Sequence, residues 1–267
     1  MDIKRVTSGL LGMAIVLVVC FIGNKYVFDV FVAIVAFLAI DEYFKAMSKI
    51  ANPVRWVGYL SCISIAVIHL IPSEYLMMTT ILSIPTILVI LFLQVVITEM
   101  KTSFKDIAYT FFGIFYIVFC TLFIALVYGR EGGNILIWIL FSAAWGCDIL
   151  AYIVGKSFGK HKFSKISPKK SIEGCIAGII GGIGFMLLFT YIANTFFNQN
   201  YSYIYISIIG LVLSILSQLG DFAASSIKRY VDIKDYSNLI PGHGGMLDRI
   251  DSLIFIAPFA YVLFSFI

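Results

Sequence analysis

The sequence predicts an all-α integral membrane protein with about nine transmembrane helices. Hydrophobic residues make up 61% of the 267 residues and charged residues only 13%, whereas a soluble domain carries about 25% charged residues. The apolar residues also form long segments separated by short polar joints. Because a bilayer core about 30 Å thick needs about 20 apolar residues per helix, these segments predict membrane spans. The length fits a single membrane domain, residues 1–267, without a separate soluble module.

Each apolar segment is long enough to cross a bilayer as a helix. The segments cover residues 7–23, 27–47, 54–72, 76–98, 107–128, 134–155, 174–197, 202–220 and 250–267. The first half of the chain, up to about residue 130, contains no recognisable motif. The polar strings that could carry chemistry interrupt the second half, from about residue 134 to 267. The first segment lacks a small-x-small cleavage site, so we interpret it as a retained span and not as a signal peptide.

The basic residues predict the orientation of the chain. If the nine spans alternate, all of the 19 lysines and arginines except Lys25 and Arg130 lie on the N-terminal side. Basic residues accumulate on the cytoplasmic side of membrane proteins. We therefore expect a multi-pass protein of the cell (inner) membrane, with a cytoplasmic N-terminus and its active site facing the cytoplasm.

Glycines in the segment 174–197 predict close helix packing. Gly174, Gly178 and Gly182 recur every fourth residue, with Gly181 and Gly184 beside them. Small residues at this spacing let the backbones of neighbouring membrane helices approach closely.

The polar stretch from Gln218 to Asp251 lies between two apolar segments and is rich in charge. Two helix-like pieces flank its turn-rich centre, NLIPGHGG. Carboxylates bind hard cations such as Mg²⁺, and lysine, arginine and glycine-loop amides bind phosphate oxygens. The charged residues are Asp221, Asp232, Asp235, Asp248 and Asp251, with Lys228, Arg229, Lys234 and Arg249. This inventory predicts metal-assisted phosphate chemistry beside a membrane.

Three of these aspartates are candidate metal ligands. Asp221 ends the eighth segment after a predicted Gln-Leu-Gly turn, and Asp248 and Asp251 are spaced to share one helix face at the start of the ninth. Carboxylates that converge from separate helices form the usual protein share of a Mg²⁺ site. Asp221 and Asp248 are the strongest candidates. The alternative is that these carboxylates pair with nearby lysines and arginines at the membrane interface.

The string Pro241-Gly242-His243-Gly244-Gly245 predicts a backbone loop that can approach a phosphate closely. Its glycines lack Cβ atoms and tolerate a positive φ. His243 could bind phosphate, contact the base or act as a general base. The last role is unnecessary, because a phosphate monoester is already ionised at neutral pH.

A second polar block begins at Asp148, which lies deep in the sixth segment. A carboxylate there costs at least about 2.5–3.5 kcal/mol, so it should face a polar cavity or a cation. Helical spacing places Asp148, Tyr152 and Lys156 on one face. The alternative is an intrahelical polar ladder that only stabilises packing.

The lysine-rich loop that follows has two different groups of residues. Lys160, Lys162 and Lys165 are explained by the preference of basic residues for anionic headgroups. Lys169 and Lys170 directly precede a predicted helix N-terminus, which can receive an anion. Glu173 could cap that helix or orient a lysine, and we favour the second. His69 and His161 are expected to have no special role.

The segment from Ser225 to Asp251, here called the signature segment, resembles a known family. Its pattern S-x-I-K-R-x₄-K-D-x-S-x₂-I-P-G-H-G-G-x₂-D-R-x-D is similar to that of the phosphatidate cytidylyltransferases (CDP-diacylglycerol synthases). The block from Asp148 to Gly174 is similar to the other polar stretch of that family. The two blocks cover about a third of the chain. The resemblance implies that a phosphatidate oxygen attacks the α-phosphorus of CTP, giving CDP-diacylglycerol and pyrophosphate.

The resemblance also implies roles for individual residues. Mg²⁺ would be bound by Asp221, Asp248 and Asp251. Catalytic roles fall to Asp148, Lys170, Lys228, Arg229, His243 and Arg249, and nucleotide binding falls to Lys169, Ser225, Lys234, Gly242, Gly244 and Gly245. The expected partners are CTP, phosphatidate and membrane lipids, with no nucleic acid. A second cation and a homodimer are left open.

Two other functions fit parts of the pattern. A CTP-dependent lipid-alcohol kinase on a related fold would yield a phosphorylated alcohol and CDP. A transporter or flippase for anionic lipids could use Asp148 and the basic loops, but it would not need the signature segment. A CDP-alcohol phosphotransferase is disfavoured because the string D-G-x₂-A-R is absent.

Overall fold

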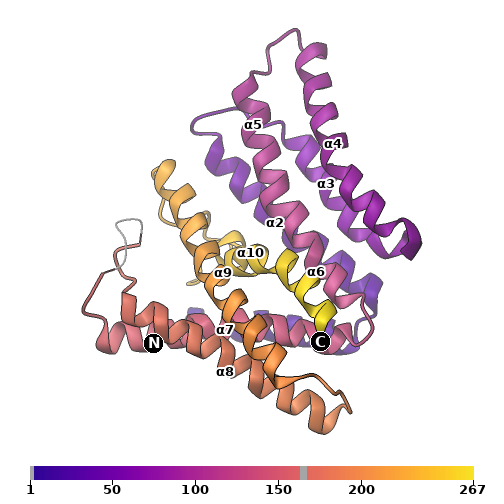
Figure 1. Cartoon of the computed structure of the whole chain (residues 1–267). Coiled ribbons are helices and arrows are strands. Elements are labelled where there is room, and N and C mark those ends of the chain that lie inside the picture. The colour runs from indigo at the N-terminus through magenta and orange to yellow at the C-terminus, as the bar shows by residue number, and fades with distance from the viewer. Residues whose placement is uncertain (1–2, 163–166) are drawn as a thin grey trace. The chain divides into compact units, whose positions relative to one another are not determined.

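The computed structural model describes residues 3–162 and 167–267, and within them it is all-helical, without a β-strand (Figure 1). Lys165 and the side chains of Lys4 and Arg5, which enter the charge distribution above, lie outside the described residues. The helices are α1 (Ile3–Ile22), α2 (Lys25–Met47), α3 (Arg55–Ala66), α4 (Ser73–Ile97), α5 (Phe104–Gly113), α6 (Cys120–Tyr128), α7 (Gly133–Phe158), α8 (Ile172–Phe196), α9 (Tyr203–Tyr230) and α10 (Leu247–Leu263). A π-helical turn, Ile114–Phe119, joins α5 to α6, and 3₁₀ turns cover Ile68–Leu70 and Phe264–Phe266.

Six helical segments of the described chain are long and apolar enough to cross a membrane. They are Ser73–Ile97, Phe104–Tyr128, Gly133–Phe158, Ile172–Phe196, Tyr203–Tyr230 and Leu247–Phe266. Each coincides with one of the last six predicted spans. Of the first three, α1 contains a shorter apolar helix, Thr7–Phe21, α3 has only 12 residues, and α2 carries several charged side chains. The multi-pass, all-helical class is therefore confirmed, whereas the count of nine spans stays a prediction.

The chain divides into two compact units. The first comprises Met1–Gly129 and Tyr230–Arg249, and the second comprises Arg130–Arg229 and Ile250–Ile267. The middle of the signature segment thus packs with the helices of the first half of the chain, which carry no motif. α10 begins in the first unit and continues in the second.

The first unit is built around α2, whose neighbours pack tightly on its aromatic side chains. A Cβ atom added at Gly58 of α3 would lie 2.4 Å from the Phe44 ring, and one added at Gly113 of α5 would lie 2.4 Å from the Tyr43 ring. Near the other end of α2, the buried Asp29 pairs with His69 at 2.8 Å. His69 therefore has a structural partner, contrary to expectation.

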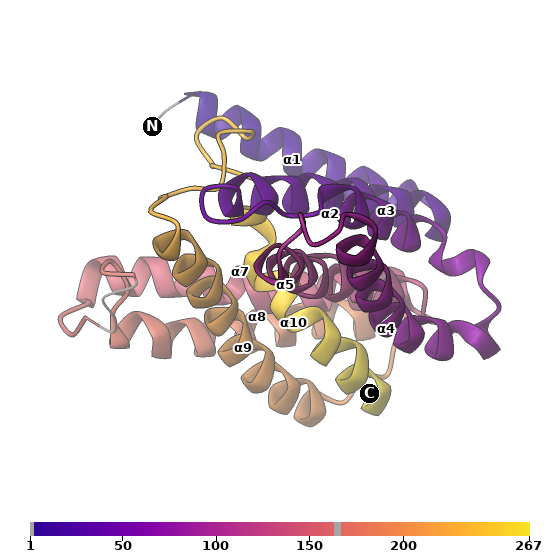
Figure 2. The same cartoon turned by 90° about the horizontal axis from the view of Figure 1, so that it is seen from above.

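In the second unit, α7 and α8 lie side by side along most of their length (Figures 1 and 2). A Cβ atom added at Gly181 would lie 2.4 Å from the carbonyl oxygen of Gly146, and one added at Gly178 would lie 3.1 Å from that of Cys147. The predicted glycine packing is confirmed at these positions. Gly184 has no atom within 4 Å of its Cβ position and takes no part in it.

The helix α9 runs without interruption through Gln218 and Gly220, so the predicted Gln-Leu-Gly turn is wrong. The glycine serves close packing instead: a Cβ atom at Gly220 would lie 2.8 Å from the carbonyl oxygen of Asp251 and 2.6 Å from Cβ of Phe255. The Gln218 side chain donates to the carbonyl oxygen of Cys175 on α8 at 2.9 Å. The sequence suggested a turn because glycine is a poor helix former, but here packing decides.

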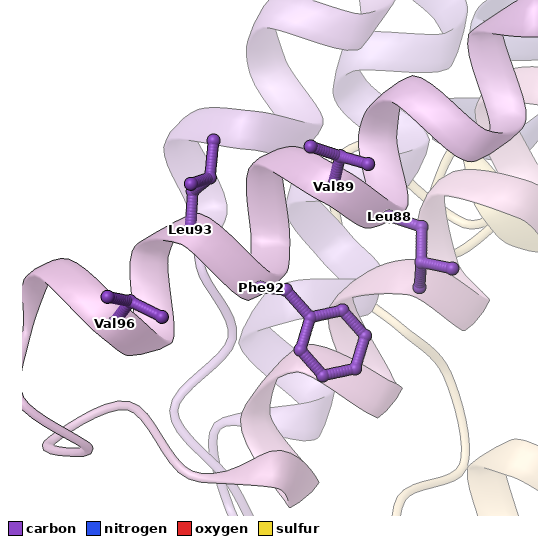
Figure 3. A pocket seen from close by; sticks show the side chains of 5 residues that line it. All are labelled: Leu88, Val89, Phe92, Leu93 and Val96. Atoms are coloured by element: carbon purple, nitrogen blue, oxygen red, sulfur yellow. The ribbon is translucent and has the colours of Figure 1, made fainter.

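An apolar depression lies on the surface of α4 (Figure 3). Its lining comes from one helix and consists of Leu88, Val89, Phe92, Leu93 and Val96. These side chains offer only carbon atoms, and the helix is the least buried of the six candidate spans. Such a surface is typical of a helix that faces lipid, and it offers no group that could bind phosphate.

The glycine packing predicts a difference between two neighbouring substitutions in α8. Gly181→Ala should lower the stability of the folded protein by about 1–3 kcal/mol, because the added methyl group meets backbone that cannot move aside cheaply. Gly184→Ala should leave stability unchanged or slightly raised, since its Cβ points into open space. The thermal unfolding midpoints of both variants in the same detergent check this. Equal midpoints would contradict the packing described.

Candidate active site

Acidic side chains of three helices come together in the second unit. Asp251 of α10 is buried, with 8% of its surface exposed. It interacts electrostatically with Asp221 of α9 and Asp148 of α7, and with the ammonium group of Lys228. The close approach of α9 and α10 at Gly220 brings the neighbouring Asp221 toward Asp251. Carboxylates gathered in this way repel one another unless positive charge lies among them.

Lys170 supplies part of that positive charge. Its ammonium group forms an ion pair with one carboxylate oxygen of Asp221 and lies 4.2 Å from the centre of the Phe222 ring. The other oxygen of Asp221 accepts a long hydrogen bond from Ser225, at 3.4 Å. The structure thus unites predicted residues from both polar blocks, Asp148 and Lys170 from one and Asp221, Ser225 and Lys228 from the other.

At the start of α8, Glu173 has a histidine partner that the sequence did not predict. The N-cap is Ser171, whose hydroxyl oxygen accepts from the backbone N–H of Gly174 at 3.1 Å. Glu173 binds His161 instead, with a distance of 2.6 Å to the ring nitrogen Nδ1. Its carboxylate also interacts with its own backbone N–H, in the first turn of α8. Lys169, next to this turn, is exposed.

The predicted alignment of Tyr152 with Lys156 on α7 is confirmed. Asp148 and Tyr152 are both exposed, and the ammonium group of Lys156 lies 5.7 Å from the centre of the Tyr152 ring. A lysine over an aromatic face is weakly favourable, so this end of the stripe is partly ordered.

In the first unit, Asp248 fixes the fold of the signature segment. Its Oδ2 atom accepts hydrogen bonds from the backbone N–H groups of Tyr236, at 2.9 Å, and Gly245, at 3.0 Å. Within the loop, the backbone N–H of His243 donates to the carbonyl oxygen of Ile240, and that of Ile240 donates to the carbonyl oxygen of Gly244, both at 2.9 Å. Gly242 and Gly244 have φ values of 77° and 85°, as the predicted need for positive φ requires. The predicted site residues Lys234 and Arg249 are exposed, as is Arg229 of the second unit.

Glu42 of α2 is the residue that sequence reasoning missed. It is 4% exposed and accepts three hydrogen bonds: from Ser237 Oγ at 2.6 Å, from Met246 N at 2.9 Å and from Leu247 N at 2.9 Å. The last two groups belong to the start of α10. The available signal was the pair Asp41-Glu42 inside an apolar segment, because acidic residues at such positions need a partner.

Other residues of the first half also hold the signature segment. The Ser8 hydroxyl donates to the carbonyl oxygen of Pro241 at 2.8 Å and lies 3.0 Å from Nδ1 of His243. The ammonium group of Lys49 donates to the carbonyl oxygen of Val231 at 3.1 Å, just after α9. The hydroxyl groups of Tyr109 and Tyr230 lie 2.8 Å apart. Helices α1, α2 and α5 therefore help to hold the signature segment in place, although they contain no motif.

The carboxylates predicted as metal ligands are divided between the two units. Asp221 and Asp251 belong to the second unit, whereas the hydrogen bonds of Asp248 lie within the first. Among the side chains that the structure describes, no group of three or more His, Cys, Asp or Glu residues is arranged to hold a metal ion alone. Any cation here therefore needs further ligands from a substrate or water.

Comparison with known proteins identifies the family of the chain. The profile of the Cytidylyltransferase family matches residues 3–267. Phosphatidate cytidylyltransferase of Bacillus subtilis is 31% identical over 270 residues, which cover 98% of this chain and 97% of the relative. The protein of that name from Synechocystis is 30% identical over 293 residues, covering 98% and 96%, and that from Thermotoga maritima is 34% identical over 164 residues, covering 61% and 60%. These matches confirm the resemblance of the signature segment, and the chain belongs to the cytidylyltransferase family.

Proposed function

We propose that this protein transfers a cytidylyl group from CTP to phosphatidate and releases pyrophosphate, forming CDP-diacylglycerol. The observation that carries the proposal is the signature segment, whose residues are ordered by a dedicated set of contacts in a chain that matches phosphatidate cytidylyltransferases over nearly its whole length. The helices that are long and apolar enough to cross a membrane suit a lipid substrate.

The reaction joins two anions, so charge neutralisation is the main task of the protein. A phosphate oxygen of phosphatidate attacks the α-phosphorus, the bond from that phosphorus to the bridging oxygen breaks, and pyrophosphate leaves with the electron pair. The attacking monoester is already ionised at neutral pH and needs no base. Lys170, Lys228 and Arg249 would offset the negative charge of both substrates, with Arg229 and His243 assisting.

The carboxylates suit a magnesium ion. We propose Asp221, Asp248 and Asp251 as the ligands. The support is strongest for Asp221 and Asp251, which interact across two helices and have lysine ammonium groups beside them. Mg²⁺ usually takes one or two protein carboxylates and completes its shell with substrate phosphates and water. When bound, it would neutralise the triphosphate and stabilise the leaving pyrophosphate.

The remaining predicted residues would bind and orient the substrates. Lys170 is in contact with Asp221, so a phosphate held by this lysine would lie next to the proposed metal ligand. Asp148 would line the floor of the cavity. Nucleotide phosphates would be bound by Lys169, Ser225, Lys234, Gly242, Gly244 and Gly245.

We also propose the topology that the basic residues suggest: nine spans, a cytoplasmic N-terminus and a site that opens to the cytoplasm from the inner membrane. The support is the distribution of lysine and arginine, of which only Lys25 and Arg130 fall on the opposite side. In this arrangement phosphatidate enters from the inner leaflet and CTP from the cytosol.

The position of a radioactive phosphate separates the proposed reaction from its alternatives. Purified protein with Mg²⁺, phosphatidate and CTP labelled at the α-phosphorus should yield a labelled lipid, whereas CTP labelled at the γ-phosphorus should yield labelled pyrophosphate and unlabelled lipid. A lipid-alcohol kinase offered a lipid alcohol would transfer the γ-label. A transporter would move neither label into a product. Thin-layer chromatography of the lipids reads the result.

The metal proposal predicts that Asp221→Asn and Asp251→Asn each reduce kcat at least about 100-fold, equivalent to about 2.7 kcal/mol of transition-state stabilisation. Both should also need more Mg²⁺ for half-maximal rate. The control is Asp232→Asn, an exposed aspartate just after α9 whose positive φ of 52° asparagine accepts readily. This variant should keep its activity within about threefold. Wild-type rates and Mg²⁺ dependence in Asp221→Asn and Asp251→Asn would show that neither carboxylate binds the ion.

The topology predicts which loops a membrane-impermeant maleimide reaches in intact cells. In a chain whose five cysteines are replaced by alanine, Arg130→Cys should be labelled from outside, and Lys101→Cys only after the membrane is permeabilised. The opposite pattern, or labelling of both positions from outside, would contradict the proposed arrangement of spans.

A further inference from the structure

We propose that Glu42 is a positioning residue for the reaction. Its carboxylate, supplied by α2, fixes the glycine loop Pro241–Gly245 and the first turn of α10, and so the metal-ligand candidate Asp248. This inference rests on the proposed function and adds to the signature segment a residue that lies about 200 positions earlier in the chain. Every contact on which it depends lies within the first unit.

The hydrogen bonds of Glu42 engage both of its oxygens. Oε1 accepts from the Ser237 hydroxyl and from Met246 N, and Oε2 accepts from Leu247 N. A carboxylate that accepts three donors and donates none is bound as the anion. The backbone N–H groups at a helix start lack partners within the helix and carry partial positive charge. The buried anion and the unsatisfied start of α10 therefore stabilise each other.

Asp248 completes the arrangement from inside the segment. Its Oδ2 atom accepts hydrogen bonds from Tyr236 N and Gly245 N. Together with the two amides bound by Glu42, four backbone amides of this turn are satisfied by the two carboxylates. One carboxylate comes from the signature segment and the other from a helix without a motif. Removing Glu42 would leave the amides of Met246 and Leu247 unsatisfied and would loosen the turn that orients Asp248.

Gly245 shows how closely the loop is fitted to Glu42. A Cβ atom at this glycine would lie 2.5 Å from Oε2 and 2.8 Å from Oε1 of Glu42. The residue has no positive φ, unlike Gly242 and Gly244, so backbone conformation does not explain its lack of a side chain. Instead, the Glu42 carboxylate occupies the space that a side chain at this position would need. The glycine and the glutamate are therefore a matched pair.

The chain offers a matched control next to Glu42. Asp41, on the same turn of α2, pairs with Lys45 at 2.6 Å and accepts from the Tyr59 hydroxyl at 2.7 Å. Asp41→Asn thus removes a charge from the same helix without touching the signature segment.

The test compares Glu42→Gln with Asp41→Asn in purified enzyme, measuring CDP-diacylglycerol formation, Mg²⁺ dependence and thermal unfolding. Glu42→Gln should lower kcat at least about 30-fold and raise the Mg²⁺ concentration for half-maximal rate, while the folded fraction is retained. Asp41→Asn should stay within about threefold of wild type in both. If Glu42→Gln instead matches Asp41→Asn, or loses only thermal stability with unchanged kcat, the positioning role is wrong. A wild-type enzyme that forms no CDP-diacylglycerol would refute the proposed function, which is a separate outcome.

Substitutions in the partners of Glu42 keep the proposal testable if Glu42→Gln does not fold. Ser237→Ala removes only one donor and should lower kcat several-fold in a folded enzyme. Gly245→Ala should lower it more, because the methyl group displaces the carboxylate. In a Glu42→Ala enzyme that folds, the space is open, so Gly245→Ala should cost much less than it does in the wild type. Losses that multiply independently, or an Ser237→Ala enzyme with wild-type kcat, would overturn the inference.

Discussion

Buried carboxylates that must find partners in a largely apolar chain govern this structure. An ionised group away from water is costly unless it is paired and hydrogen-bonded. Glu42 meets this requirement with the amides at the start of α10, and Asp248 with the amides of Tyr236 and Gly245. The half-buried Asp221 pairs with Lys170. Each partner is a group that the proposed chemistry also needs in place. The contacts that stabilise these charges therefore also fix the positions of the site residues.

This constraint explains how the two halves of the chain share the work. The motifs lie in the second half, yet the hydrogen bonds that shape the glycine loop come from Ser8 and Glu42 in the first half. The second unit, in contrast, orders its polar residues through close helix packing, with glycine at the crossings of α7 with α8 and of α9 with α10.

Much of this could be predicted from the sequence, because the signals are local. Apolar length located the six long helices, the glycine spacing located the packing face of α8, and i, i+4 spacing aligned Tyr152 with Lys156. The failures involve contacts that local patterns do not encode. The contact of Glu173 with His161 joins residues on either side of a loop, and the partners of Glu42 lie about 200 residues away in the sequence.

The length of α9 has a consequence for the depth at which the chemistry takes place. A helix of 28 residues is about 42 Å long, which exceeds a hydrocarbon core of about 30 Å by roughly two turns. The apolar part of α9 comes first, so the surplus turns are those that begin near Asp221 and end at Tyr230. If the apolar part spans the hydrocarbon core, these turns stand at the level of the lipid headgroups. A diacyl substrate would thus present its phosphate to this helix while both of its acyl chains stay in the hydrocarbon core of the bilayer.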